Sequence, residues 1–288
     1  MDNKQNIQWF PGHMTKTKRQ ITAQLGLIDA VAEIVDARIP ISSRNPDLAE
    51  LIAGKPLVIL LNKCDMADPS ATADWIEYYK KNGIPAIPVD CKTGKGLSAF
   101  KDTVKSILAD KLAAYREKGM VGKPLRVMVV GIPNVGKSSF INRIAGNSKA
   151  KVENRPGVTR GNQWFAIDRE LELLDTPGVL WPKFDDETVG EHLAFTGAVT
   201  DRIIDTELLG MRLLEILSEE YPELLKKRYG VEDFSVDAYD MLEYIGAKRG
   251  MKMRGGCVDT ERAANMLLEE FRSCKLGTVT LERVKNSA

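Results

Sequence analysis

The stretch GIPNVGKS at residues 131–138 decides the fold. It follows the apolar run 126–130, which we expect to be a strand, and it opens an expected helix over residues 137–145. A glycine-rich loop between a strand and a helix is the P-loop arrangement, in which backbone N–H groups and the positive end of the helix surround a phosphate. The sequence therefore predicts a site for the phosphates of a nucleotide.

A second motif, DTPG at residues 175–178, follows another apolar run. We expect Lys137 to bridge the β- and γ-phosphates and Gly178 to offer its N–H to the γ-phosphate. The Ser138 hydroxyl would bind Mg²⁺, and the Asp175 carboxylate would serve the outer shell of the metal. The expected phosphate-binding residues are Asn134, Val135, Gly136, Lys137, Ser138, Ser139 and Gly178. Two turns without a ligand are disfavoured, because both motifs follow predicted strands.

The base is identified by NKCD at residues 62–65, which ends another apolar strand. The Asp65 carboxylate can accept hydrogen bonds from guanine N1–H and from the exocyclic amine, whereas adenine offers no matching pair of donors. The segment DCKTG at residues 90–94 is similar to the loop whose backbone contacts the guanine oxygen in other GTPases. We therefore expect GTP and GDP as ligands, bound through Asn62, Lys63, Asp65, Cys91 and Lys92.

The alternation of strands and helices predicts an α/β fold with a mostly parallel sheet. Apolar runs typical of buried strands occur at residues 30–35, 57–61, 84–89 and 126–130, with a further strand pair at 163–167 and 171–174. Helical patterns occur at residues 15–27, 74–82, 97–115, 206–220 and 259–272. We expect a GTPase domain over residues 1–187 and a smaller all-α domain over residues 188–288.

The guanine motifs precede the phosphate loop, which reverses the usual order of a G domain. The strand that ends in DAR at residues 36–38 resembles the strand that normally follows DTPG, so the chain is predicted to be circularly permuted. Residues 116–124 would join the old ends. The segment after DTPG then leads directly into the C-terminal domain, and we expect loss of the γ-phosphate to reorient that domain.

Composition excludes several other classes of protein. The 41 Lys and Arg residues balance 40 Asp and Glu residues, so no basic field covers the whole protein. No apolar run approaches the ~18 residues of a membrane-spanning helix. The four cysteines form no CxxC pair, which makes zinc improbable, and Cys64 and Cys91 are interpreted as small buried residues. We expect a cytoplasmic monomer.

The chain resembles the ribosome biogenesis GTPase A family, within the circularly permuted YlqF/YawG group. Besides the three nucleotide motifs, the resemblance rests on WFPGHM at residues 9–14, DARIPISSRNP at 36–46, RPGVTR at 155–160 and LLDTPGVLWPKF at 173–184. It implies a GTPase that binds a late precursor of the large ribosomal subunit, promotes its maturation and leaves after hydrolysis. It also implies Thr159 as a Mg²⁺ ligand.

The resemblance further implies that the C-terminal domain contacts ribosomal RNA. The expected phosphate contacts are Lys248, Arg249, Lys252 and Arg254. The alternative interpretation of this cluster is an ordinary solvated surface. A second function is also possible, a nucleotide-sensing RNA-binding adaptor in which hydrolysis is incidental, whereas a protein or membrane partner is disfavoured because no lipidation motif is present.

Hydrolysis needs a group that orients the attacking water, and Val179 stands where many GTPases have a glutamine. The candidate is His13, to which the resemblance assigns a catalytic role, although a surface or RNA-contacting histidine is the alternative. His192 is a weaker rival. Asn134 occupies the position of the asparagine that binds K⁺ in K⁺-stimulated GTPases; the alternative is a side-chain hydrogen bond within the loop.

Overall fold

The computed structural model describes residues 19, 21–52, 54–120, 122–146, 163–178, 186–199 and 205–284. These residues form two compact units. One contains the described residues up to 178 together with residues 282–284, and the other contains residues 186–281. Three positions from the sequence analysis lie outside the described residues. They are the predicted site residues His13 and Thr159, and Val179, which stands where many GTPases have a glutamine.

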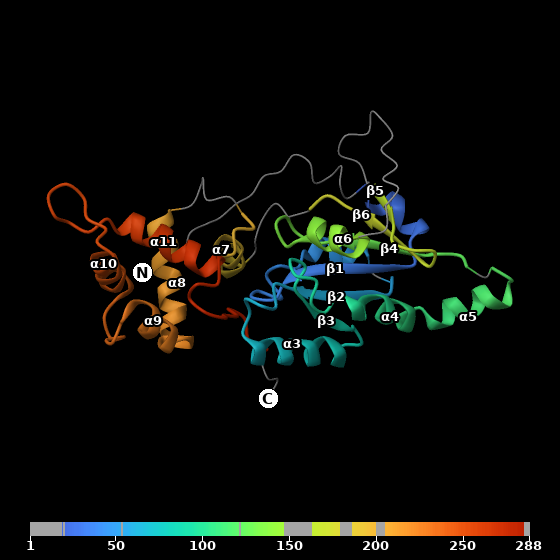
Figure 1. Cartoon of the computed structure of the whole chain (residues 1–288), viewed down its shortest axis with the longest axis horizontal. Coiled ribbons are helices and arrows are strands. Elements are labelled where there is room, and N and C mark those ends of the chain that lie inside the picture. Colours follow the sequence, from blue (N-terminus) through green and yellow to red (C-terminus); the bar gives the residue numbers. More distant parts are fainter. Residues whose placement is uncertain are drawn as a thin grey trace, which may run out of the picture. The chain divides into compact units, whose positions relative to one another are not determined.

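The first unit is built on a mostly parallel sheet (Figure 1). Its described strands are β1 (Ala30–Asp36), β2 (Leu57–Asn62), β3 (Ala86–Val89), β4 (Leu125–Val130), β5 (Gln163–Ala166) and β6 (Leu171–Asp175). They lie in the order β3-β2-β1-β4-β6-β5, and only the pairing of β5 with β6 is antiparallel. The predicted fold class is confirmed.

The strand order brings the sequence motifs to one edge. The chain moves outward from β1 to β2 and β3, and then returns to place β4 on the other side of β1. Where connections leave neighbouring parallel strands in opposite directions, a crevice opens at the carboxyl ends of those strands. The loops after β1, β2, β3, β4 and β6 all begin at this edge, so NKCD, DCKTG, GIPNVGKS and DTPG converge there despite their permuted order.

Helices flank the sheet (Figure 1). They are α2 (Pro46–Leu51), α3 (Pro69–Lys81), α4 (Ser98–Ile107), α5 (Ala109–Glu117) and α6 (Lys137–Ala145), with a short 3₁₀ helix η1 (Leu25–Leu27). Helix α3 begins before the predicted residue 74, because Asp68 caps the N–H groups of Ser70 and Ala71. The prediction of one helix over residues 97–115 is wrong. The helix breaks at Leu108, since the buried apolar face that supports α4 does not continue into α5.

The core of this unit is continuous with the sheet. Trp75 and Tyr79 of α3 pack against Val35, Ile59 and Leu61 of the strands. Helices α4 and α6 contact each other through Phe100 and Phe140, whose rings meet edge to face with centroids 5.0 Å apart. Burial of these large side chains is the main favourable contribution to the free energy of folding of this unit. It holds in place the strands from which the loops extend.

The segment 282–284 belongs to the sheet unit although it follows the helical unit in the sequence. The Glu282 carboxylate accepts the N–H groups of Ile41 and Ser42 at 2.6 and 2.9 Å, and the Glu282 carbonyl accepts the indole N–H of Trp75 at 2.9 Å. Arg283 forms an ion pair with Asp68 at 2.8 Å. The helical unit is therefore connected to the sheet unit through both of its ends.

The second unit is helical in its described residues, as predicted. It contains α7 (Glu187–Phe195), α8 (Thr206–Glu220), α9 (Pro222–Tyr229), α10 (Ala238–Lys248) and α11 (Thr260–Arg272). Helices α8 and α11 approach closely at Gly210, where an added Cβ atom would lie 2.6 Å from the Ala264 Cβ. Among the described helices of the chain, none is both long enough and apolar enough to cross a membrane.

Replacement of Glu282 by alanine should destabilise the sheet unit. The change removes the acceptor of two backbone N–H groups, and a charged acceptor of this kind contributes about 1–3 kcal/mol. Urea unfolding should therefore show a lower midpoint for Glu282→Ala than for the wild type. The matched control is Glu243→Ala, a change at an exposed glutamate of α10, which should leave the midpoint unchanged. Equal midpoints for all three proteins would show that the Glu282 contacts contribute no stability.

Candidate functional site

Two glycines allow the phosphate loop to approach its neighbours. Gly131 has φ +150°, and an added Cβ atom would lie 2.6 Å from the Ile34 carbonyl oxygen. Gly136 has φ +104°, and its Cβ would lie 2.3 Å from the Asn62 amide nitrogen. Any larger residue at either position would be both strained and in collision. The loop after β4 is therefore packed directly on β1 and on the guanine motif.

Lys137 is the first residue of α6, and its side chain is nearly buried. Its ammonium group donates to the carbonyl oxygens of Gly131 and Ile132 at 2.9 and 2.7 Å. Burial lowers the pKa of Lys137 to about 8, although the nearby charge of Asp175 opposes this shift. The Lys137 ammonium group thus lies inside the phosphate loop, where a bound phosphate would stabilise its protonated form.

The DTPG segment lies against the phosphate loop. Thr176 donates its hydroxyl to the Val129 carbonyl at 2.7 Å, and an added Cβ on Gly178 would lie 2.9 Å from the Lys137 Nζ. One carboxylate oxygen of Asp175 is buried without a hydrogen-bond partner among the described residues. Burial raises the pKa of Asp175, while Lys137 opposes the shift. A buried carboxylate oxygen without a hydrogen-bond partner among the described residues is the donor chemistry that suits Mg²⁺.

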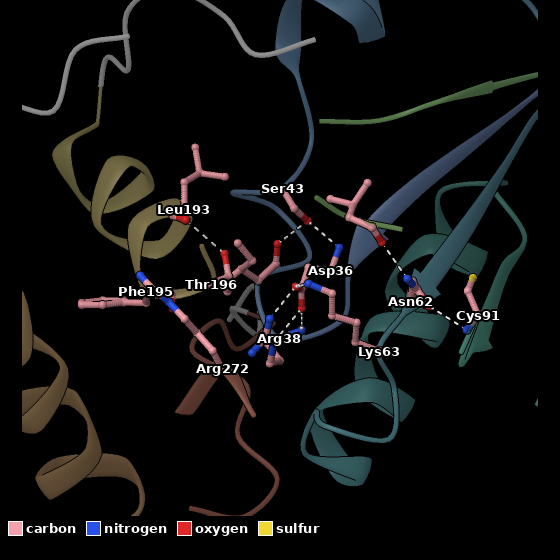
Figure 2. Close-up of polar contacts among 12 residues, drawn as sticks. Asp36, Arg38, Ser43, Asn62, Lys63, Cys91, Leu193, Phe195, Thr196 and Arg272 are labelled. Atoms are coloured by element: carbon pink, nitrogen blue, oxygen red, sulfur yellow. Dashed lines mark hydrogen bonds and ion pairs between the residues drawn. The ribbon is translucent and has the colours of Figure 1, made fainter. Parts of the chain in front are cut away.

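Asn62 joins three loops at the base end of the site (Figure 2). Its amide nitrogen donates to the Val135 carbonyl in the phosphate loop at 2.6 Å. Its amide oxygen accepts the Cys91 N–H in the second guanine segment at 3.0 Å. One side chain therefore fixes the spacing between the predicted phosphate loop and the second predicted guanine segment.

The second guanine segment is shaped by Asp90. Its carboxylate accepts the N–H groups of Lys92 and Thr93 at 2.8 and 3.2 Å and also the Thr93 hydroxyl. These hydrogen bonds close a tight turn. Burial, with smaller contributions from Asp90 and Cys64, raises the pKa of Cys91 to about 12. The Cys91 thiol is therefore neutral, and its residue contributes through the backbone.

A cavity of about 600 Å³ lies between these loops. It is lined by Asn62, Lys63, Asp65, Met66, Asp90, Cys91, Lys92, Asn134, Gly136, Ser139, Asn142 and Arg143. It brings the predicted guanine residues together with part of the predicted phosphate loop. Val135, Lys137, Ser138 and Gly178 do not line it, and Lys137 lies instead beside Gly178 and Asp175.

Four lining residues were not among the predicted site residues: Met66, Asp90, Asn142 and Arg143. Ser139, Asn142 and Arg143 occupy positions i, i+3 and i+4 of α6, so they share one face of the helix that follows the phosphate loop. The spacing of these polar residues was the sequence signal that could have identified Asn142 and Arg143 as lining residues. Arg143 also donates to the Thr93 carbonyl, a partner that no local pattern indicates.

The predicted basic cluster lies at the end of α10 and in the following loop. Lys248 donates to the Gly230 carbonyl at 3.1 Å and lies 4.6 Å from the centre of the Tyr244 ring. Arg249 lies 5.4 Å from the centre of the Tyr229 ring. Lys252 and Arg254 are exposed beyond them, as are the other two. The rival histidine, His192, is buried in α7 of the same unit.

Comparison with known proteins identifies the family. Residues 126–225 match the profile of the 50S ribosome-binding GTPase family. The chain is 50% identical over 278 residues to ribosome biogenesis GTPase A of Priestia megaterium, which covers 96% of each chain. The chain belongs to the ribosome biogenesis GTPase A family. The relative from Thermotoga maritima in this family is 34% identical over 280 residues, with 96% of this chain and 94% of the relative covered.

Two solved structures of YlqF are similar to this chain along most of its length. A GDP-bound YlqF structure superimposes with a TM-score of 0.66 at 28% identity and covers 93% of this chain and 100% of the other. YlqF from Thermotoga maritima bound to GNP gives 0.62 at 29% identity, with coverage of 93% and 98%. The chain is therefore a P-loop GTPase that binds guanine nucleotides and hydrolyses GTP, and this family of enzymes requires Mg²⁺ in general.

Replacement of Asp65 by asparagine should change the base that the site accepts. An amide presents a donor where the carboxylate presents an acceptor, so it opposes the exocyclic amine of guanine and matches the carbonyl of xanthine. Titration should show affinity for GDP reduced by ~100-fold or more, with a gain for xanthosine diphosphate. Asp74→Asn, at an exposed residue of α3, is the control and should bind GDP normally. Unchanged GDP selectivity in Asp65→Asn would place the base elsewhere.

The pKa of Lys137 predicts a pH dependence for GDP binding. The free protein loses the proton as pH rises through about 8, whereas a bound phosphate favours the charged lysine. The terminal phosphate is already ionised above about pH 7, since its second pKa is near 6. Affinity should therefore fall about fourfold between pH 7 and 8.5.

Isothermal titration calorimetry at several pH values would measure this slope. Lys137→Arg is the matched control, because a guanidinium does not titrate in this range. It should bind GDP with no such slope, even if its affinity is lower. A slope of equal size in both proteins would assign the titration to another group.

Proposed function

We propose that the chain binds a late precursor of the large ribosomal subunit, promotes its maturation and is released after GTP hydrolysis. The observation that supports this most directly is the combination of a guanine-nucleotide cavity in one unit with an exposed basic and aromatic cluster in the other. The names of relatives that match along 96% of the chain point the same way.

In the proposed site, Asp65 reads the base and Asn62 fixes the two loops around it. Lys63, Cys91 and Lys92 complete the guanine contacts, with Cys91 acting through its N–H. The glycine turn at Gly136 leaves room for backbone N–H groups to face the phosphates, because no side chain fits there.

The phosphates would be bound by the loop residues Asn134, Val135, Gly136, Lys137, Ser138 and Ser139, together with Gly178. Lys137 contributes a cation, and its burial means that phosphate binding recovers the cost of desolvating that charge. Ser138 and Asp175 would hold Mg²⁺, with Thr159 as a further ligand. The metal, when bound, neutralises charge on the β- and γ-phosphates.

Water activation is the step that this chain must perform without a glutamine after DTPG. We assign it to His13, since an imidazole can accept a proton or orient water near neutral pH. The positive charge that other systems supply with an arginine could come from K⁺ beside Asn134. Asn134 is exposed, lines the cavity and has φ +61°, a backbone conformation that asparagine tolerates better than most residues.

The helical unit would contact ribosomal RNA through Lys248, Arg249, Lys252 and Arg254. Stacking against Tyr244 and Tyr229 restricts Lys248 and Arg249, which lowers the entropy lost when they bind phosphate. Such contacts position the protein on RNA but read no sequence. We propose that the chain acts as a monomer in the cytoplasm, where ribosomal precursors are assembled.

An alternative function is a nucleotide-sensing RNA-binding adaptor in which hydrolysis is incidental. It is favoured by Val179, which can neither donate nor accept a side-chain hydrogen bond. The two functions differ in one respect: an adaptor has no need for its RNA target to accelerate hydrolysis.

The decisive experiment measures GTP turnover with and without large ribosomal subunits, in KCl and in NaCl. Wild type should be accelerated by subunits, and more in KCl than in NaCl. His13→Ala should bind a GTP analogue normally but lose the acceleration, whereas the matched control His192→Gln should keep it. Absence of acceleration in the wild type would favour the adaptor. Equal acceleration in His13→Ala would remove that histidine from catalysis, and equal rates in both salts would remove K⁺.

A further inference from the structure

The end of β1 carries a buried cluster of charges beside the guanine motif (Figure 2). Asp36 is the last residue of β1 and pairs in register with Asn62 of β2. One of its carboxylate oxygens accepts the Arg38 N–H and Nε at 3.1 and 2.9 Å. The other accepts Arg38 Nη2 at 2.8 Å and the Lys63 ammonium at 2.9 Å.

The cluster is held rigidly from both sides. The Asp36 N–H donates to the Ser43 hydroxyl oxygen at 3.0 Å, and that hydroxyl donates to the Ile39 carbonyl at 2.6 Å. The Ala37 N–H donates to the Asn62 carbonyl at 2.8 Å. The carboxylate that faces Lys63 is therefore fixed by a closed loop and by the neighbouring strand.

The buried Asp36 carboxylate pairs with two cations, although one would balance its charge. The Asp36 and Arg38 side chains are 3% and 1% exposed, so both have lost their hydration, and a bidentate Arg38 already balances the carboxylate. Lys63 adds a second cation whose side chain is 24% exposed. Burial alone would raise the pKa of Asp36, but Arg38 and Lys63 lower it well below its ordinary range. The carboxylate is therefore ionised at neutral pH.

Lys63 connects this cluster to the nucleotide cavity, which it lines together with Asn62 and Asp65. Its backbone has φ +60°, a conformation that costs a lysine about 1 kcal/mol or more and that persists only when surrounding contacts impose it. The ion pair with Asp36 is such a contact. The direction of the Lys63 side chain is thus set by the buried pair of Asp36 and Arg38, and neither of these residues lines the cavity.

The same strand carries a second buried pair that serves for comparison. Glu33 is 1% exposed and accepts Arg44 Nε and Nη2 at 3.0 and 2.8 Å. Both pairs join β1 to the loop that follows it. Glu33 and Arg44 do not line the cavity, and these hydrogen bonds do not reach the guanine motif. Any general effect of losing a buried ion pair from β1 should therefore appear at Glu33 as well.

We infer that Asp36 and Arg38 are positioning residues for guanine-nucleotide binding: the buried carboxylate, neutralised by Arg38, holds the Lys63 ammonium at the base end of the cavity. The inference rests on the proposed role of Lys63 in binding guanine nucleotides. It assigns a binding function to the DAR segment, which supplies no residue to the cavity lining.

The test is a double-mutant cycle on GDP affinity, measured by calorimetry on the full chain. Lys63→Met keeps most of the apolar stem and removes the charge. It should weaken GDP binding by ~10-fold or more, which is the size of a charge-assisted contact. Asp36→Asn should weaken binding to a similar extent. The double variant should be no weaker than Lys63→Met alone, because Asp36 acts only through Lys63.

Glu33→Gln is the matched control. It should lower the thermal midpoint, since it also disturbs a buried pair, yet GDP affinity should stay within about twofold of the wild type. If Asp36→Asn fails to fold, as judged by circular dichroism, Asp36→Glu takes its place. It keeps the charge but displaces it by one methylene group, so it should also weaken GDP binding in a manner that depends on Lys63.

The outcomes distinguish the binding role of Lys63 from the positioning role of Asp36. Unchanged GDP affinity in Lys63→Met would overturn the assignment of Lys63 to the guanine site. If Lys63→Met weakens binding but Asp36→Asn behaves like Glu33→Gln, the guanine site stands and the positioning role is wrong. Additive losses in the double variant would also overturn it, because independent contributions mean that Asp36 does not act through Lys63.

Discussion

The hydrogen bonds of the Asn62 side chain are the interaction on which the nucleotide site depends. A single amide donates to the phosphate loop at Val135 and accepts from the second guanine segment at Cys91. An amide is suited to this position because it offers a donor and an acceptor at a fixed spacing. The close approach is possible only because Gly136 has no side chain to collide with that amide. The distance between the base pocket and the phosphate loop is therefore set by one short side chain.

The parallel sheet makes the order of motifs along the chain unimportant to the site. Strands β1, β2 and β3 enter the sheet before β4, yet the carboxyl ends of all of them meet at one edge. Permutation changes instead which segments enter and leave the helical unit. That unit follows the DTPG segment and is succeeded by Glu282, which returns to the loop after β1 through the N–H groups of Ile41 and Ser42. The nucleotide loops and the helical unit are thus linked through two chain connections.

Burial of charge is concentrated at β1. Asp36 and Glu33, which pair with Arg38 and Arg44, lie on a strand that is buried along its whole length. Apolar residues of the same volume would stabilise such positions at least as well. The cost is understandable at Asp36, since it directs Lys63 towards the cavity. For Glu33, which has one buried oxygen without a partner among the described residues, the structure offers no comparable reason.

The sequence by itself determined the class of fold and predicted the chemistry of the site. Each of the motifs GIPNVGKS, NKCD and DTPG is one uninterrupted run of residues at the end of an apolar strand. Their roles therefore depend on local geometry, which a short sequence pattern can express. Tertiary structure alone decided the strand order, the break at Leu108, the reach of Arg143 to Thr93 and the return of Glu282 to Ser42. The same is true of Lys63 on Asp36. These partners are distant in sequence, and only the folded sheet makes them neighbours.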